Sequence, residues 1–71
     1  MAQEASVRIA RAEQMANQVD QRKLTLDQEE TYLTVKSFLV KAKKAVLAKD
    51  FARASTLADK AIILTEELAK N

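Results

Sequence analysis

Two long runs of helix-forming residues meet at Lys23-Leu24-Thr25-Leu26-Asp27-Gln28. Thr25 followed by Gln28 matches the capping box that begins a helix, and Asp27 with Glu30 offers an alternative cap. The acidic residues just after the break would lie at the positive end of the helix that follows, where they are stabilising. This stretch therefore predicts that one helix ends before it and another begins within it.

The rest of the chain contains few other signals that end a helix. Its 71 residues include no Gly and no Pro, the two strongest helix breakers. The second break lies at Lys49-Asp50-Phe51, where Asp50 is a favourable N-cap. Because no Gly is present to take the left-handed C-cap position, we expect a tight, slightly strained corner there. The predicted helices span about residues 3–23, 27–48 and 51–70.

Each predicted helix carries an apolar stripe at helical spacing, and short connections force neighbouring helices to run antiparallel. The stripes are, in chain order, Ala5, Ile9, Ala12, Ala16 and Val19; Tyr32, Val35, Leu39, Ala42 and Val46 with Phe38 and Ala45 beside them; and Phe51, Ala54, Leu57, Ala58, Ala61, Leu64 and Leu68 with Ile62 beside them. Ile63 lies on the polar side of the third helix. We predict an all-α fold, an antiparallel up-down-up three-helix bundle that forms a single domain over residues 1–71.

A second apolar line runs along the predicted middle helix at a spacing of seven residues. It consists of Leu33, Val40 and Leu47, with Lys36 and Lys43 between it and the first stripe. A helix with two apolar lines usually contacts two neighbours, so we expect the middle helix to be the central one. If the first helix covers this line, the line belongs to the core. If the first helix packs on the Val35 side, the line is exposed and becomes a partner-binding seam.

A continuous helix over about residues 3–49, followed by a short return helix, is a competing arrangement. Its apolar line at a spacing of seven comprises Ala5, Ala12, Val19, Leu26, Leu33, Val40 and Leu47. Such a helix would pair with a second copy as a coiled coil. The partner positions of the repeat are Lys23, Glu30, Ser37 and Lys44, so the second apolar half of a coiled-coil seam is missing. We favour the compact bundle and keep a homodimer as the alternative.

The composition argues against catalysis and metal binding. Cys and His are absent, which removes thiolate nucleophiles, disulfides and the usual acid, base and metal ligands. Without Gly there is no phosphate-binding loop of the known types. The adjacent carboxylates of Glu29–Glu30 and Glu66–Glu67 point about 100° apart on a helix and cannot share one substrate atom. We expect no enzyme activity, no catalytic residue, no metal and no cofactor.

Basic residues gather near the second break, although the net charge is only +2. The densest basic cluster consists of Lys41, Lys43, Lys44, Lys49 and Arg53. Of these, the predicted anion-binding residues are Lys41, Lys44, Lys49 and Arg53. This cluster supports a second hypothesis, a binder of anionic surfaces such as nucleic acid or membrane headgroups. Mild net charge and only three aromatic residues argue against nucleic acid. The longest apolar run has four residues, so we expect no transmembrane segment.

The sequence does not indicate a cell compartment. The first residues, Met1-Ala-Gln-Glu, show neither the basic nor the apolar region of a signal peptide. A leader removed beforehand would leave the same start. Absence of Cys fits the cytoplasm and also a cell envelope.

Residues 38–64 resemble a tetratricopeptide-repeat helical hairpin. The run from Lys49 to Ala54 is similar to the family's Gly-Asp-Tyr turn followed by Ala, and Lys60-Ala61-Ile62 is similar to its Lys-Ala-Leu. Phe38 and Ala42 stand at the family's first aromatic and first small position. The departures are Lys41 for an apolar residue, Ala45 for an aromatic, Lys49 for Gly and Glu66 for the closing Pro. A single copy is present, whereas solenoids need three or more.

Two other groups of small helical domains have a similar hairpin. These are the microtubule-interacting-and-transport domains and the small helical domains of bacterial envelope lipoproteins. The resemblance implies a helical hairpin and a groove that takes a partner peptide or helix. Our first hypothesis is therefore a non-enzymatic helical interaction or scaffold module, which binds a partner or itself through Leu33, Val40, Leu47, Lys36 and Lys43.

Overall fold

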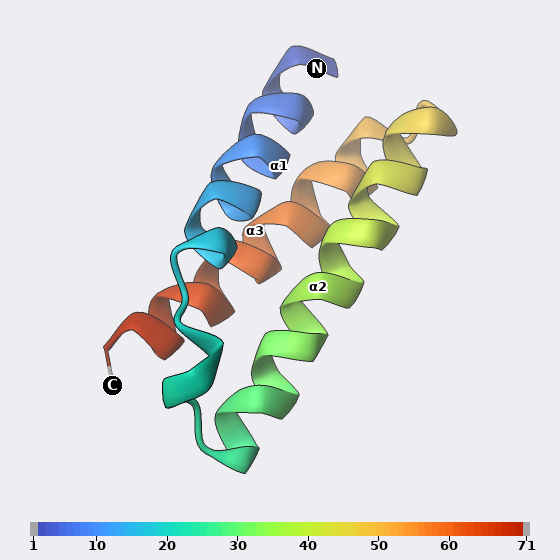
Figure 1. The fold of residues 1–71 in the computed structure, drawn as a ribbon. Helices are drawn as coiled ribbons and strands as arrows, with labels where there is room; N and C mark the ends of the chain where they lie inside the picture. The colour runs from blue at the N-terminus through green and yellow to red at the C-terminus, as the bar shows by residue number, and fades with distance from the viewer. Residues whose placement is uncertain (1, 71) are drawn as a thin grey trace.

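The computed structural model describes residues 2–70, and this part of the chain forms three α-helices, one short 3-10 helix and no strand. The elements are α1 (Ala2–Asn17), η1 (Gln21–Lys23), α2 (Leu26–Leu47) and α3 (Phe51–Ala69). α1 and α3 run in the same direction and α2 runs antiparallel to both (Figure 1). The predicted all-α, up-down-up three-helix bundle is confirmed. The alternative of a continuous helix through residue 49 is wrong, because the chain reverses direction between α1 and α2.

α1 ends at Asn17, whereas the apolar stripe predicted a helix to Lys23. Its end tightens into 3-10 geometry, since the Val19 amide donates to the Ala16 carbonyl three residues back at 3.2 Å. Val19, the last residue of the predicted stripe, therefore lies outside the helix. It is half-buried and packs against the core from the connecting segment.

Asp20 explains why the chain leaves the helical path. Its carboxylate accepts a hydrogen bond of 3.1 Å from the Arg22 amide and caps η1. An Asp that bonds its own neighbouring backbone offers the chain an alternative to helix continuation. The Gln21 side chain then donates to the Tyr32 hydroxyl at 3.2 Å, which ties the connection to α2. Local polar contacts thus end α1 despite the apolar repeat.

α2 begins with the predicted capping box. The Thr25 hydroxyl accepts from the Gln28 amide at 3.2 Å, and the Gln28 side-chain oxygen accepts from the Thr25 amide at 2.9 Å. Two amides that the helix itself cannot satisfy are paired in this way. Thr25, and not Asp27, is the N-cap.

The second reversal confirms the expected strained corner. Lys49 has a φ of 62°, the left-handed conformation that Gly usually takes. Its amide donates to the Val46 carbonyl at 2.9 Å, and the Asp50 amide donates to the Ala45 carbonyl at 2.8 Å. This pair of bonds is the Schellman arrangement that ends a helix. Asp50 then caps α3 by accepting from the Arg53 amide at 3.2 Å.

We expect Lys49→Gly to raise the free energy of unfolding by about 0.5–1 kcal/mol. A residue with a Cβ is strained at this φ by about 1–2 kcal/mol, and the larger entropy of Gly in the unfolded chain offsets part of the gain. Urea unfolding followed by circular dichroism measures the change. Lys49→Ala is the matched control and should bring no such gain. Equal stability of the two variants would show that Lys49 is not strained.

α3, and not α2, is the central helix. It packs against both other helices, while the contact between α1 and α2 is the smallest of the three. The prediction of a central middle helix is therefore wrong, since it assumed that both apolar lines of α2 face neighbours. Buried residues of α3 are Ala54, Leu57, Ala58, Ala61, Thr65 and Leu68. Thr65 was not predicted to be buried; its hydroxyl donates to the Ala61 carbonyl at 2.7 Å and is satisfied there.

Alanines form much of the helix-to-helix contact. The alanines that are at most 1% exposed are Ala5, Ala12, Ala16, Ala42, Ala54, Ala58 and Ala61. Larger side chains such as Val35, Leu39 and Leu57 fill the space beside them. Small residues let helix axes approach closely, so the bundle is narrow, with extents of 36 × 16 × 14 Å. Closely packed helices leave little room for larger side chains at the alanine positions.

Candidate functional site: the outer face of α2

Four large apolar side chains lie exposed in one line along α2. Leu26 is 81% exposed, Leu33 66%, Val40 53% and Leu47 84%. α1 packs on the Val35 side of α2, which leaves this line uncovered. The interpretation of Leu33, Val40 and Leu47 as core is therefore wrong, and the alternative of an exposed line holds. We call these four residues the outer apolar line.

A polar line with the same spacing runs beside the outer apolar line. Glu30, Ser37 and Lys44 each follow one of its residues by four positions, and all three are exposed. Residues four apart share a helix face, so the two lines make one surface. Within residues 2–70 the side chains of these three polar residues form no hydrogen bond or ion pair. They are free to meet a partner.

The sequence missed part of this face. Leu26 belongs to the seven-residue repeat, but the partner-binding set predicted from the sequence does not include it. Glu30, Ser37 and Lys44 were interpreted as a gap in a coiled-coil seam. Both lines have a spacing of seven residues within residues 26–47. Applied to that range alone, this spacing would have identified all of these residues.

The two lysines predicted to flank the apolar line have contacts within the bundle. Lys43 forms an ion pair with Glu13 of α1, with Nζ and Oε2 2.8 Å apart. The ammonium of Lys36 lies 5.5 Å from the centroid of the Tyr32 ring, within cation–π range. Both side chains are exposed and lie at the edge of the outer face toward α1. Lys43 therefore joins α1 to α2 in addition to lining this edge.

A shallow groove continues the outer face between α1 and α2. It consists of two hollows of about 310 Å³ and about 180 Å³, and both are lined by Glu13 and Lys43. Leu47 lines the first hollow and Val40 the second. The outer apolar line thus borders a groove along the weakest helix contact of the bundle. Extended apolar surface beside a groove suits a helix as ligand.

The predicted anion-binding residues lie toward one end of the bundle. Lys41 and Lys44 are in the second half of α2, Lys49 is in the corner, and Arg53 is in the first turn of α3. All four side chains are exposed, and none forms an ion pair within residues 2–70. The four side chains lie toward the same end of the molecule, but no ion pair within residues 2–70 fixes their positions relative to one another.

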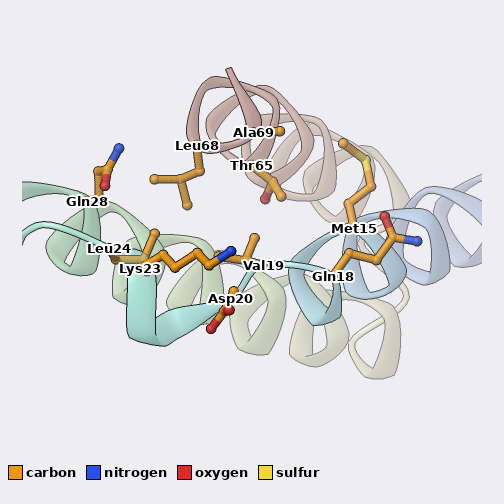
Figure 2. A pocket seen from close by; sticks show the side chains of 10 residues that line it. All are labelled: Met15, Gln18, Val19, Asp20, Lys23, Leu24, Gln28, Thr65, Leu68 and Ala69. Carbon is orange, nitrogen blue, oxygen red and sulfur yellow. The ribbon is translucent and has the colours of Figure 1, made fainter. Parts of the chain in front are cut away.

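A pocket of about 390 Å³ lies at the opposite end (Figure 2). The end of α1, the connection to α2 and the last turns of α3 enclose it, with Met15, Val19, Leu24 and Leu68 supplying much of the apolar lining. No buried side-chain nitrogen or oxygen of the described chain lacks a hydrogen-bond partner. The pocket therefore contains no buried, unpaired polar group that would orient a ligand. Its existence depends on the path between α1 and α2, which the sequence did not predict.

Metal binding, membrane insertion and similarity to known proteins give no assignment for this chain. Over residues 2–70, no group of three or more Asp and Glu side chains is placed to hold a metal ion. No helix in that range combines the length and apolar character required to cross a bilayer. No known protein family, curated protein or solved structure matches the chain.

Proposed function

We propose that this chain is a non-enzymatic helical interaction module that holds a partner helix against the outer face of α2. The observation that carries the proposal is the exposure of four aligned apolar side chains, between 53% and 84% each. Full burial of such a side chain contributes about 1.5–3 kcal/mol. Four of them in one line supply enough apolar area for reversible binding of a helix.

The arrangement of the face supports a helical partner. A seven-residue spacing drifts only slowly around a straight helix, so a second helix can follow the line at the small crossing angle of about 20° found in coiled coils. Such a helix would contact the outer apolar line over the full length of α2. The resemblance of the α2–α3 hairpin to tetratricopeptide repeats implies the same class of function by analogy.

Val40→Lys should abolish partner binding without unfolding the domain. Val40 is 53% exposed at the middle of the line, so the substitution removes apolar contact area and leaves the core intact. A phage-displayed library of amphipathic helical peptides is selected on the wild-type domain. We expect the selected peptides to bind the wild type and to lose at least about tenfold in affinity for Val40→Lys.

Ile63→Lys on α3 is the matched control, since Ile63 is similarly exposed at 57%. The selected peptides should bind this variant as well as they bind the wild type. Circular dichroism of both variants checks that the helices are intact. Peptides that bind Val40→Lys unchanged would place the binding face elsewhere and contradict the proposal.

A second candidate function is binding to anionic surfaces. Four exposed basic side chains that form no ion pair within residues 2–70 favour it, namely Lys41, Lys44, Lys49 and Arg53. It predicts sedimentation with phosphatidylserine vesicles at low salt and release at about 0.5 M salt, where charges are screened beyond about 4 Å. Replacing all four residues by Gln should abolish this binding. Absence of binding to vesicles, DNA and RNA at low salt would remove this candidate.

A further inference from the structure

We propose that the partner helix is α2 of a second copy of this chain, packed antiparallel across a two-fold axis. This inference rests on the proposed function and names its partner. It is based on the order of apolar, acidic and basic residues along the outer face. When the same face is turned end to end, apolar residues meet apolar residues and acidic residues meet basic ones.

The first part of the argument is the separation of charge along α2. Its first turns carry Asp27, Glu29 and Glu30, and its second half carries Lys41, Lys43 and Lys44. A parallel second copy would place like charges opposite one another. An antiparallel copy places the acidic end of each helix against the basic end of the other. Charge complementarity of this kind sets the orientation of paired helices.

The second part is the register. A two-fold axis between residues 36 and 37 brings Leu33 opposite Val40 of the second copy and Leu26 opposite Leu47. With the same axis, Glu30 lies one residue, about 1.5 Å along the helix, from the level of Lys44 of the second copy, and Ser37 lies equally near its own counterpart. Each contact occurs twice, because a two-fold interface is isologous. One register therefore places the apolar line level with its counterpart and brings the oppositely charged residues of the polar line within one residue of each other.

The small Ser37 side chain supports this placement of the axis. Two helices in contact come closest at their crossing point, where bulky side chains would hold them apart. Ser37 is exposed and lies midway between the ends of the outer face. Glu30, Ser37 and Lys44, which are not apolar enough for a coiled-coil seam, can thus pair with the same three residues of an antiparallel second copy.

The size of the face sets the expected strength. A helix of 22 residues is about 33 Å long, so a single helix pair buries area at the low end for specific interfaces. We expect a reversible dimer that forms at concentrations of about 0.1–1 mM. Sedimentation equilibrium of the full chain over about 10 µM to 1 mM should show a mass that rises from one copy toward two.

Charge reversal tests the register. Glu30→Lys and Lys44→Glu should each weaken dimerisation about tenfold or more, because each places two like-charged pairs in the interface. The double variant Glu30→Lys with Lys44→Glu restores opposite charges and should recover dimerisation. Glu66→Lys, an exposed charge reversal on α3, is the control and should have no effect beyond that of net charge.

A single cysteine tests the position of the axis. The chain has no Cys, so Ser37→Cys introduces a unique thiol. Under mild oxidation this variant should form a disulfide-linked dimer faster than Thr56→Cys, an exposed control on α3. Circular dichroism checks that both variants keep their helices.

The outcomes separate this inference from the proposed function. Dimerisation with rescue in the double variant supports both. A chain that stays monomeric at 1 mM, or single and double charge variants that dimerise alike, overturns the second copy as partner. In that case, peptides that bind the wild type and not Val40→Lys would still support a helix-binding face. If the chain neither dimerises nor loses peptide binding in Val40→Lys, both proposals are contradicted.

Discussion

Val35→Asp is expected to unfold the protein at room temperature. Val35 is 0% exposed on the inner face of α2, where it packs in the cluster that contains Tyr32 and Leu39. A carboxylate buried there without a partner costs several kcal/mol, beyond the lost apolar contact. A chain of this length has a total stability of about 4–10 kcal/mol. We therefore expect loss of most helical circular dichroism, or a fall of several kcal/mol in the free energy of unfolding.

Val40→Asp is the matched control for that experiment. Val40 lies on the same helix, and the substitution changes helix propensity and charge in the same way. Its side chain lies on the outer face, so the structure predicts a change within about 0.5 kcal/mol. Thermal and urea unfolding of both variants give the comparison. Equal destabilisation at the two positions would show that both faces of α2 are buried and would contradict the fold.

Ala58→Leu is expected to destabilise the bundle by about 1–3 kcal/mol. Ala58 is 0% exposed on the central helix and belongs to the cluster that includes Ala5 of α1 and Ala42 of α2. Extra methyl groups at such a contact force off-rotamer side chains or move the helices apart. Leu and Ala are both strong helix formers, so the loss reports packing and not helix propensity.

Ala52→Leu is the corresponding control on α3. Ala52 is exposed, and the larger side chain has room to extend into solvent. We expect its free energy of unfolding to stay within about 0.5 kcal/mol of the wild type. If Ala58→Leu proved as stable as Ala52→Leu, the close approach of the three helices at Ala58 would be wrong.

The caps and turns at the starts of α2 and α3 were predicted correctly from the sequence. The Thr25 capping box, the Asp50 cap and the strained corner at Lys49 are confirmed because each depends on a few neighbouring backbone groups. The buried face of α3 was also predicted correctly, except that Phe51 and Leu64 are half-buried and Thr65 is buried. The Thr65 hydroxyl donates to the Ala61 carbonyl one turn earlier, so this polar side chain can be buried in the core.

The end of α1 and the choice of the buried face of α2 were not predictable from apolar spacing. The apolar repeat continued past Asn17, but the Asp20 cap and the contact of Val19 with the core ended α1 earlier. The spacing did not decide whether the line of Leu33, Val40 and Leu47 is buried or exposed. α1 packs through its alanine stripe on the Val35 side, and this tertiary choice decides which line stays exposed.

The candidate site was predicted in part for the same reason. Leu33, Val40 and Leu47 are exposed on one helix because α1 packs on the other face, and their role in partner binding stays a prediction. Lys43 was assigned to a partner, and its ion pair with Glu13 gives it a role between α1 and α2. That ion pair joins helices far apart in the chain, and no local pattern encodes it.

The distance between residues 6 and 47 tests the fold-back of α1 onto α2 most directly. Nitroxide labels on Ser6→Cys and Leu47→Cys, measured by double electron–electron resonance in chains diluted with unlabelled protein, report this distance within one copy. Both positions line one hollow of the bundle, so we predict a distance below about 25 Å, given helix axes about 10 Å apart and flexible labels. A distance near 60 Å, which a continuous helix at about 1.5 Å per residue would give, would contradict the three-helix bundle and its exposed line.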